Sequence, residues 1–240
     1  PAVFRAVMET DAEVLLKSDV ATASEQDRAD LVAALLALKP EERLWNVNMN
    51  LGQQYGKLLH PGLGAQLGAV ISDRALGVTR RVVAIEIAEA CRLQTLSPEL
   101  VALALDSSET RLVREAAAQA MAQIGDEASK ARLKPLALRE HDDDPDDELK
   151  GHSLHAIWPA HVTAEELFTA LTLPKREDFV GAYRSFLWYQ VVPYLTLTDL
   201  PVAVRWVEKH SPRATPQGLT GEFKPLTDAI IRLALEHLDE

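Results

Sequence analysis

The chain has 240 residues, of which 47% are hydrophobic and 25% are charged, and its formal net charge is −11. This composition is typical of a globular protein rather than a disordered one. The negative charge disfavours phosphate backbones, so we expect no nucleic-acid partner. No apolar run approaches the ~18 residues of a membrane-spanning helix, and no signal peptide opens the chain, so we expect no membrane association. The single cysteine, Cys91, excludes an internal disulfide and fits a cytoplasmic location.

Alanine and leucine are abundant and long alternations of β-branched residues are missing, which predicts helices throughout. In chain order, Ser24–Asp27 resembles a capping box, and leucines follow it at helical spacing. Pro40 predicts another helix start, and Pro61-Gly62 predicts a break. A short amphipathic helix should follow over Leu63–Ile71.

Three segments then align with one another without gaps: Asp73–Cys91, Asp106–Ile124 and Asp142–Ala160. Each opens on an aspartate and carries a basic residue eight positions later, and the register steps are 33 and 36 residues. Four further columns of mostly small or apolar residues lie at relative positions 0, 1, 3 and 4, which places them on one stripe of a helix. The basic residues are Arg81, Arg114 and Lys150. The stripe residues are Ala84, Ile85, Ile87, Ala88, Ala117, Ala118, Ala120, Met121, Ser153, Leu154, Ala156 and Ile157.

Partner helices should lie beside these segments, over Pro98–Leu105, Glu127–Leu138 and Thr163–Leu171. Neither helix of such a pair can bury its apolar stripe alone, whereas stacked pairs bury a continuous core. We therefore predict an all-α fold, an α-solenoid of helical repeats. The signatures of ankyrin and tetratricopeptide repeats are missing. The recurrent aspartate, the Val113-Arg114 pair and the Ile124-Gly125 ending resemble HEAT repeats of the short bacterial kind, which implies an α-α superhelix.

In such repeats the recurrent aspartate and basic residue are usually structural. The resemblance implies that Asp73, Asp106 and Asp142 cap the N-terminus of the second helix of each pair. We also consider the hypothesis that each basic residue pairs with an aspartate of the neighbouring turn, which would make a ladder along the stack. In the stripe, Ala117 and Ala120 should be buried where helices approach closely.

We predict a single helical-repeat domain over residues 1–240. Residues 1–62 should form N-terminal helices, residues 63–171 the clearest repeats, and residues 172–240 the C-terminal helices. Within the last part, the most aromatic stretch is Phe179–Tyr189 and the clearest long loop is Ser211–Gly221. Because the chain begins on proline rather than methionine, we expect it to be a fragment of a larger protein.

The acidic run at residues 140–148 raises the question of a metal site. An EF-hand loop starting at Asp142 would need glycine at position 6 and glutamate at position 12, but Asp147 and Ser153 stand there. The nearby histidines lack a Cys-x₂-Cys pair or a compact set of zinc ligands. These histidines are His141, His152, His155 and His161. We therefore expect no metal and no cofactor, and we read the run as a carboxylate-rich turn at a helix N-terminus.

This turn nevertheless carries more carboxylates than its siblings, which marks it as a candidate partner-facing feature. As surface residues, Asp143 and Asp147 should tolerate substitution by asparagine at a cost of about half a kcal/mol or less. Trp188 and Tyr189 extend off a predicted core stripe, so one of them should be exposed. The partner-facing candidates are Asp143, Asp144, Asp146, Asp147, Trp188 and Tyr189.

Nucleophile, phosphate-binding and zinc-protease motifs are missing from the sequence. Cys91 lies on an apolar helical pattern and is expected in the core. We therefore expect no enzyme activity. The alternative is an enzyme, or an enzyme partner, on a HEAT-like scaffold, such as a bilin lyase or a DNA glycosylase. The acidic charge and the missing catalytic motifs disfavour this alternative.

Several longer segments are similar to the helical-repeat region of large bacterial signal-transduction ATPases with NACHT-like nucleotide-binding modules. They are Leu15–Leu38, Arg80–Leu96, Asp144–Leu171 and Ala182–Leu187. The chain lacks the Walker motif of the ATPase module, so the resemblance reaches only the repeat region. It implies a protein-interaction or sensor module of a signalling or defence NTPase. The implied partner is the NTPase module itself or a trigger protein.

Overall fold

The computed structural model describes residues 6–8, 12–38, 54–176, 178–210 and 223–237, and the predicted helix start at Pro40 and the loop Ser211–Gly221 lie outside them. The described residues form helices and turns with no strand, which confirms the all-α prediction. The chain divides into two compact units, Pro1–Asp126 and Glu127–Glu240. The division lies within the predicted repeats, so a single domain over residues 1–240 stays a prediction. No helix in the described part combines the length and the apolar character needed to cross a bilayer.

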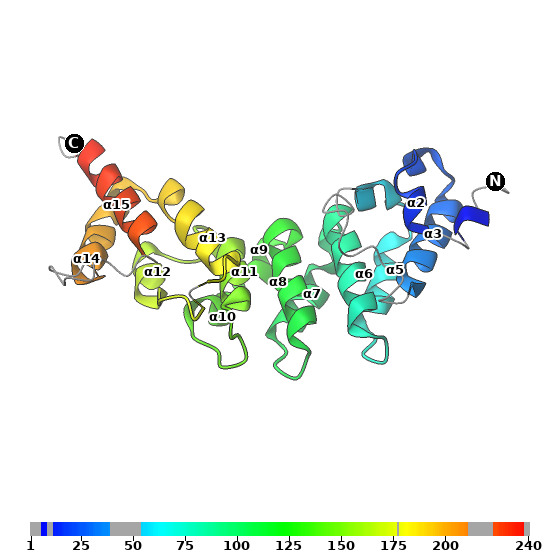
Figure 1. Cartoon of the computed structure of the whole chain (residues 1–240), viewed down its shortest axis with the longest axis horizontal. Helices are drawn as coiled ribbons and strands as arrows, with labels where there is room; N and C mark the ends of the chain where they lie inside the picture. The colour runs from blue at the N-terminus through cyan, green and yellow to red at the C-terminus, as the bar shows by residue number, and fades with distance from the viewer. Residues whose placement is uncertain (1–5, 9–11, 39–53, 177, 211–222, 238–240) are drawn as a thin grey trace. The chain divides into compact units, whose positions relative to one another are not determined.

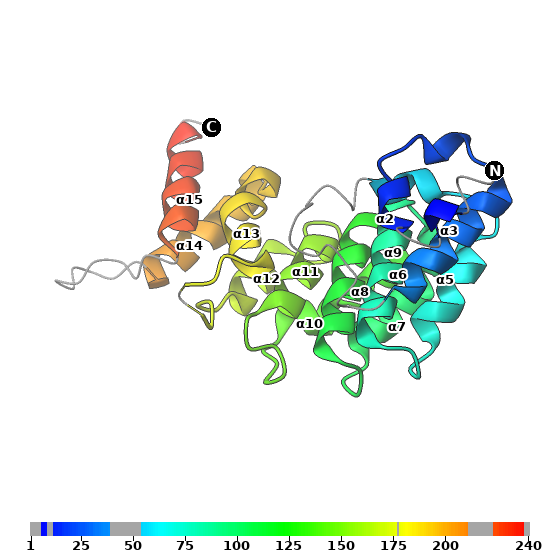
Figure 2. The same cartoon turned by 45° about the vertical axis from the view of Figure 1, so that its right-hand side comes forward.

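The first unit is a stack of helix pairs (Figures 1 and 2). Helix α5 packs on α6, α7 packs on α8, and α6 packs on α8, so two layers of helices face each other. Helix α3 also lies against α6. The bounds are α2 Ala12–Leu15, η1 Val20–Thr22, α3 Glu25–Ala37, η3 Gly56–Leu58, α5 Leu63–Ser72, α6 Val78–Ala90, η4 Gln94–Leu96, α7 Ser97–Leu105 and α8 Arg111–Ile124.

The second unit repeats this plan with shorter and more interrupted helices (Figure 1). Helices α10, α12 and α14 form one row, α11, α13 and α15 form the other, and the rows pack together through the pairs α10–α11 and α14–α15. The bounds are α9 Glu127–Ala131, α10 Lys134–Leu138, α11 Glu148–Ile157, α12 Ala164–Ala170, α13 Ala182–Tyr189, η5 Val192–Tyr194, η6 Leu197–Asp199, α14 Leu200–His210 and α15 Lys224–Glu236.

The predicted repeat stripe is the core of both units. All twelve stripe residues on α6, α8 and α11 are buried, and Ala117 and Ala120 have no exposed surface. Small side chains at these positions let neighbouring helices approach closely, and their burial drives the stacking of the pairs. The prediction of an α-solenoid of helical repeats is therefore confirmed.

The recurrent aspartates act differently from the predicted cap. Asp73 and Asp106 end helices α5 and α7, and each accepts a hydrogen bond at Oδ1 from the backbone N–H two residues on, at 2.9 Å. They therefore shape the turn and do not cap the following helix, because an aspartate side chain readily closes such a turn. The third recurrent aspartate, Asp142, is exposed, and the cap of α11 comes from Asp144.

The basic residues of the repeat are all buried, with exposures of 2% for Arg81, 3% for Arg114 and 1% for Lys150. Arg81 Nε donates to the Ile71 carbonyl and Arg114 Nε to the Ala104 carbonyl, each ten residues back at the end of the preceding helix. These bonds satisfy carbonyls that a helix C-terminus leaves without an intrahelical partner.

A ladder between neighbouring turns is present in the first unit, in a form that differs from the hypothesis. Arg81 Nη2 lies 2.7 Å from Glu109 Oε2, and Arg74, rather than the repeat arginine, pairs with Asp106. The hydrogen bond from Arg81 is the main cause that holds the pKa of Glu109 below its usual value, against the opposing effect of burial. Arg74 of the turn before α6 and Arg81 near the start of α6 are therefore both paired with acids of the turn before α8.

Candidate functional site

The acidic run of the second unit begins with a buried helix cap. Asp144 accepts hydrogen bonds from the Leu149 and Lys150 N–H groups, at 3.2 and 3.0 Å, and is 1% exposed. Its carboxylate therefore satisfies two of the donors that a helix start leaves open, and its negative charge suits the positive end of α11. Asp144 is not available to a partner, which corrects its place among the partner-facing candidates.

Asp147 is the second buried carboxylate of the run. It is 1% exposed and adopts the left-handed conformation, with φ of 57°, immediately before α11. Its Oδ2 accepts from the Lys175 N–H at 2.8 Å, and its Oδ1 lies 3.4 Å from Lys175 Nζ. The prediction that Asp147 is a surface residue facing a partner is therefore wrong, because a distant cation draws the carboxylate inward.

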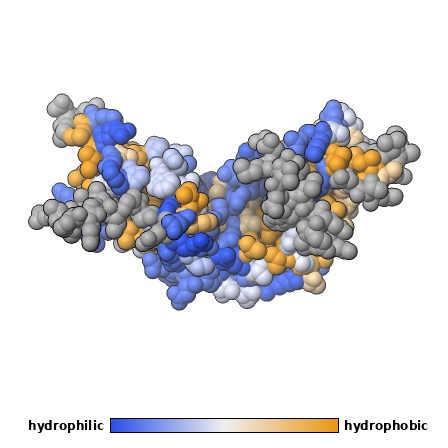
Figure 3. All heavy atoms as spheres, in the orientation of Figure 1, coloured by the Kyte–Doolittle hydropathy of each residue, from blue (hydrophilic) through white to orange (hydrophobic). Residues whose placement is uncertain are grey.

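The loop after α12 supplies the cations that balance this turn. Lys175 Nζ donates to the carbonyls of His141 and Asp144, both at 2.8 Å, and Arg176 pairs with Asp146 at 3.0 Å. Hydrophilic residues cover the surface over α10 and the turn that follows it (Figure 3). The acidic run and its backbone thus bind Lys175 and Arg176 of the same chain. We call this set of contacts between residues 141–147 and residues 175–176 the joint. Of the acidic candidates, Asp143 is exposed and its role stays a prediction.

Lys150, at the start of α11, binds the end of α12 close to the joint. Its Nζ donates to the Ala170 carbonyl at 2.9 Å and to Thr172 Oγ1 at 2.8 Å, and it lies 4.9 Å from the centre of the Tyr183 ring. Burial lowers the pKa of Lys150, and nearby acids led by Asp147 oppose that effect. Lys150 therefore reaches forward to the end of α12, whereas the two repeat arginines reach back.

The four histidines do not gather into a metal site. His141 contacts the Pro135 carbonyl, His155 contacts the Ala182 carbonyl, and His161 lies 2.9 Å from Glu127 Oε2. Burial and the neighbouring His155 lower the pKa of His152 to about 4. Across the described residues, no group of three histidine, cysteine, aspartate or glutamate side chains is placed to hold a metal ion.

The aromatic candidates and the cysteine lie as follows. Tyr189 is 65% exposed, whereas Trp188 is half-buried and meets it edge to face. The expectation that one of the two is exposed is confirmed.

Cys91 is buried, its Sγ donates to the Tyr55 carbonyl at 3.2 Å, and burial raises the pKa of its thiol to about 11. The core assignment of Cys91 is confirmed.

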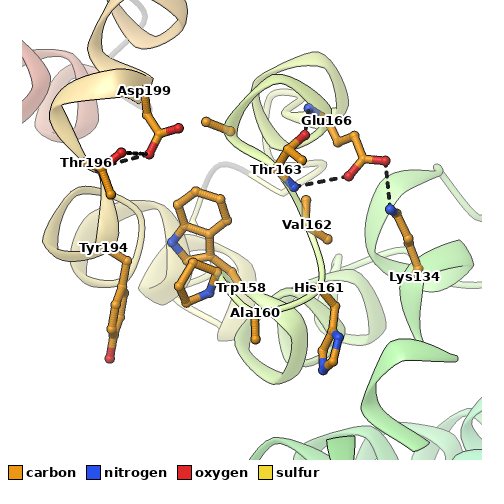
Figure 4. Close-up of a pocket in the computed structure, with 12 residues that line it drawn as sticks. Lys134, Trp158, Ala160, His161, Val162, Thr163, Glu166, Tyr194, Thr196 and Asp199 are labelled. Carbon is orange, nitrogen blue, oxygen red and sulfur yellow. Dashed lines mark hydrogen bonds and ion pairs between the residues drawn. The ribbon is translucent and has the colours of Figure 1, made fainter. Parts of the chain in front are cut away.

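A pocket of about 610 Å³ lies elsewhere in the second unit, at residues that were not predicted as a site from the sequence (Figure 4). One wall is the turn between α11 and α12 with the start of α12, and the other is the η5–η6 segment. Lys134 contributes from α10. The lining residues are Lys134, Trp158, Pro159, Ala160, His161, Val162, Thr163, Ala164, Glu166, Tyr194, Thr196 and Asp199.

Two capping boxes hold the walls of this pocket. At the start of α12, Thr163 and Glu166 exchange hydrogen bonds, and at the start of η6 Thr196 and Asp199 do the same. Each box satisfies open backbone donors and fixes the entry of the chain into its helix. Between them, Trp158 is 8% exposed, and its Nε1 donates to the Gln190 carbonyl at 3.1 Å. Burial and this hydrogen bond therefore hold the Trp158 indole in place as the floor of the pocket.

The cations of the pocket are already paired. Lys134 Nζ lies 2.7 Å from Glu166 Oε1, and its hydrogen bond is the main cause that lowers the pKa of Glu166. His161 is the other basic side chain of the lining, and it contacts Glu127. A smaller hollow of about 300 Å³ shares Glu166 with the main pocket and is otherwise lined by Leu138, Glu165, Thr169 and Ala170. The signal for the main pocket in the sequence was Trp158-Pro159 at a helix end, followed 35 residues later by Tyr194.

A family model described as HEAT repeats matches residues 65–157 of the chain. Comparison with curated proteins and with solved structures gave no match. The matched residues run from α5 to the end of α11. They contain the first two aligned segments, the third up to Ile157, and every buried stripe residue and basic residue of the three. Residues 65–157 of this all-α chain are therefore a HEAT-repeat region.

Proposed function

We propose that this chain is a non-enzymatic protein-interaction module, the repeat region of a larger signalling or defence NTPase. The observation that carries the proposal is the HEAT-repeat region at residues 65–157, since HEAT repeats generally mediate protein interaction. Stacked helix pairs expose extended surfaces on both rows, and such surfaces suit recognition of other proteins.

The surroundings of the reactive side chains support a role without catalysis. Cys91 is buried with a raised pKa, which disfavours the thiolate that nucleophilic chemistry needs. His152 and His155 both have pKa values lowered by burial, and His155 is hydrogen bonded to a backbone carbonyl. These groups stabilise the fold and do not converge on one cavity.

The charge of the chain favours a protein partner over nucleic acid. The net charge is −11, and Arg74, Arg81, Lys175 and Arg176 are all paired with acids of the chain itself. Binding to a phosphate backbone relies on cations that can replace its counterions. We propose a cytoplasmic protein partner, either the NTPase module of the same polypeptide or a trigger protein.

The resemblance of Leu15–Leu38 and Asp144–Leu171 to repeat regions of NACHT-like ATPases supports the NTPase context. The reading frame that encodes the chain tests it first: a Walker motif in the same frame is expected. The encoded NTPase module is then produced separately, and its binding to the chain is measured by isothermal titration calorimetry.

Binding between the chain and that module, with no ATP turnover by the chain alone, is the expected result. ATP hydrolysis by the purified chain would contradict the non-enzymatic role. A reading frame without an NTPase module would contradict the NTPase context and leave the interaction role to be tested with other proteins of the same operon.

A further inference from the structure

The pocket of the second unit has an apolar surface to which both of its walls contribute. Pro159 of the α11–α12 turn is exposed, Tyr194 of the η5–η6 segment is 49% exposed, and both line the pocket together with Trp158. Figure 4 shows the Trp158 indole between the η5–η6 segment and the start of α12. Pocket walls of this kind stabilise the aliphatic stem of a long side chain by burying its methylene groups. A ring face next to such a stem also attracts the cationic head.

The η5–η6 wall also carries a carboxylate with an open oxygen, that of Asp199. Asp199 Oδ2 accepts hydrogen bonds from Thr196 N and Thr196 Oγ1, at 2.9 and 2.6 Å. Within the part of the chain that the structure describes, Asp199 Oδ1 has no hydrogen bond and no cation within 4.0 Å. In Figure 4 this oxygen points toward the interior of the pocket.

The remaining charges of the pocket do not balance Asp199. Lys134 is held by Glu166, and His161 is held by Glu127, so neither basic side chain of the lining is free to meet it. The pocket therefore presents an uncompensated negative charge beside aromatic and proline surface. A cation with an aliphatic stem matches both properties, and an anion matches neither.

We propose that this pocket binds a lysine or arginine side chain of an extended segment of a partner protein, with the stem on Trp158, Pro159 and Tyr194 and the cationic head on Asp199. The inference rests on the proposed interaction function and names the chemistry of the partner. The volume of about 610 Å³ exceeds what one side chain fills, so flanking residues of the segment also enter. Pro159 and Tyr194 favour an aliphatic residue or proline beside the cation.

The test uses the full chain and an immobilised array of random hexapeptides. The bound peptides should be enriched in lysine or arginine next to an aliphatic residue or proline. Fluorescence anisotropy with the best peptide then compares the chain with three variants. Asp199→Asn keeps an acceptor for Thr196 and removes only the charge, Tyr194→Ala removes the aromatic wall, and Tyr194→Phe keeps it.

We expect Asp199→Asn to weaken binding by about tenfold, since the amide oxygen can still accept a hydrogen bond from the cationic head but no longer carries the opposite charge. Tyr194→Ala should weaken binding by a similar factor and Tyr194→Phe by less than about twofold. Glu208→Gln is the matched control, because Glu208 is an exposed acid of the adjacent helix α14 that does not line the pocket. It should leave the affinity unchanged.

Three outcomes of the peptide experiment would overturn the inference. The first is an array that selects no basic residue, and the second is a best peptide whose affinity is the same for Asp199→Asn and Glu208→Gln. The third is free spermidine that binds as tightly as the best peptide with the same sensitivity to the variants, which would make the pocket a site for small amines. Binding of the NTPase module that survives Asp199→Asn would keep the proposed function and reject this pocket alone.

Discussion

The turn before α8 and the turn before α11 stand at the same place in the repeat and are held together in different ways. In the first unit, residues 106–110 bind the preceding turn through Arg74 and Arg81. In the second unit, residues 140–147 bind the loop that follows α12 through Lys175 and Arg176. The turn before α8 binds residues of the preceding repeat. The turn before α11 instead binds a loop that comes later in the chain.

The difference shows what a repeat preserves and what it leaves open. The basic residue of the repeat, which follows the turn, is buried in both units. Its partner changes from a carbonyl ten residues back, for Arg114, to a carbonyl twenty residues ahead, for Lys150. A buried cation must find acceptors, and the local geometry of the unit decides which ones are in reach.

The largest loss of stability is expected from a substitution in the buried stripe, which the two units share. Ala117→Asp places a carboxylate where the native side chain has no exposed surface. The variant should lose about 3–5 kcal/mol of unfolding free energy, because an unpaired buried charge carries that cost. Urea denaturation followed by circular dichroism measures the loss. Gln119→Asp introduces the same carboxylate on the exposed face of α8, so it serves as the matched control and should cost less than about 1 kcal/mol.

The next effect sharpens the difference between the units. Gly151 aligns with Val82 and Glu115, which carry side chains at the same place in the first unit. In the second unit, a Cβ at Gly151 would overlap the backbone of Tyr183, because α11 and α13 approach at backbone distance. Gly151→Ala should therefore destabilise the protein by about 2–3 kcal/mol, since the overlap is with rigid backbone.

The same denaturation measurement on Gly77→Ala provides the control, because a Cβ there meets no atom within 4 Å. Gly77 is the N-cap of α6, where alanine is a poorer cap than glycine. Alanine also restricts the unfolded chain, which offsets part of that loss, so the net cost should stay below about 1 kcal/mol. Equal losses for the two alanine variants would show that α11 and α13 can separate without cost.

The sequence predicted the stripe well and the joint poorly, for a physical reason. Side chains such as Ala117 and Ile157 carry the helical period in their size, and the period predicts which face is buried. The Asp147 carboxylate is held by a lysine 28 positions away, and no local pattern encodes that contact. An acidic run in isolation is typical of a solvated turn, so the prediction of exposure followed from local pattern alone.

The pocket escaped prediction for a related reason. Its walls come from residues 158–166 and 194–199, two segments that meet only because α12 and α14 pack on each other. The capping box at Thr163–Glu166 was recognisable from sequence as a helix start. The spare oxygen of Asp199 depends on which atoms reach it, and that is a property of the folded unit.

The two units should lose stability in different pH ranges. In the second unit the pKa of His152 is about 4 when folded, below the value of about 6.5 expected when unfolded. Glu148 Oε2 lies 3.8 Å from its ring, but burial and the charge of His155 outweigh that attraction. The unfolded chain thus binds the proton more tightly, so stability is complete above about pH 6.5 and falls as the pH drops to about 4.

Between pH 7 and pH 5 the loss attributable to His152 is on the order of 2 kcal/mol. Urea midpoints at pH 7 and pH 5 should differ for the native chain, and His152→Gln should reduce the difference. In the first unit, the lowered pKa of Glu109 acts in a more acidic window, with stability lost only as the pH falls below about 4.5. Glu109→Gln should therefore leave the pH 7 to pH 5 difference intact. A difference abolished by Glu109→Gln would reverse the assignment.

The smallest expected effect tests whether the acidic run is a joint or a solvated surface. Asp147→Asn keeps an oxygen to accept the Lys175 N–H, and asparagine tolerates the left-handed backbone of this position. Only the charge that faces Lys175 Nζ is lost, so we expect a loss of about 1 kcal/mol, more than the half kcal/mol of a surface residue. Asp142→Asn in the same run is the matched control, because Asp142 is exposed, and its effect should be indistinguishable from zero. Adding 1 M salt to the denaturation series strengthens the comparison, since screening weakens exposed charges much more than buried ones. If Asp147→Asn matches Asp142→Asn at both salt concentrations, then the ion pair between Asp147 and Lys175 contributes no measurable stability.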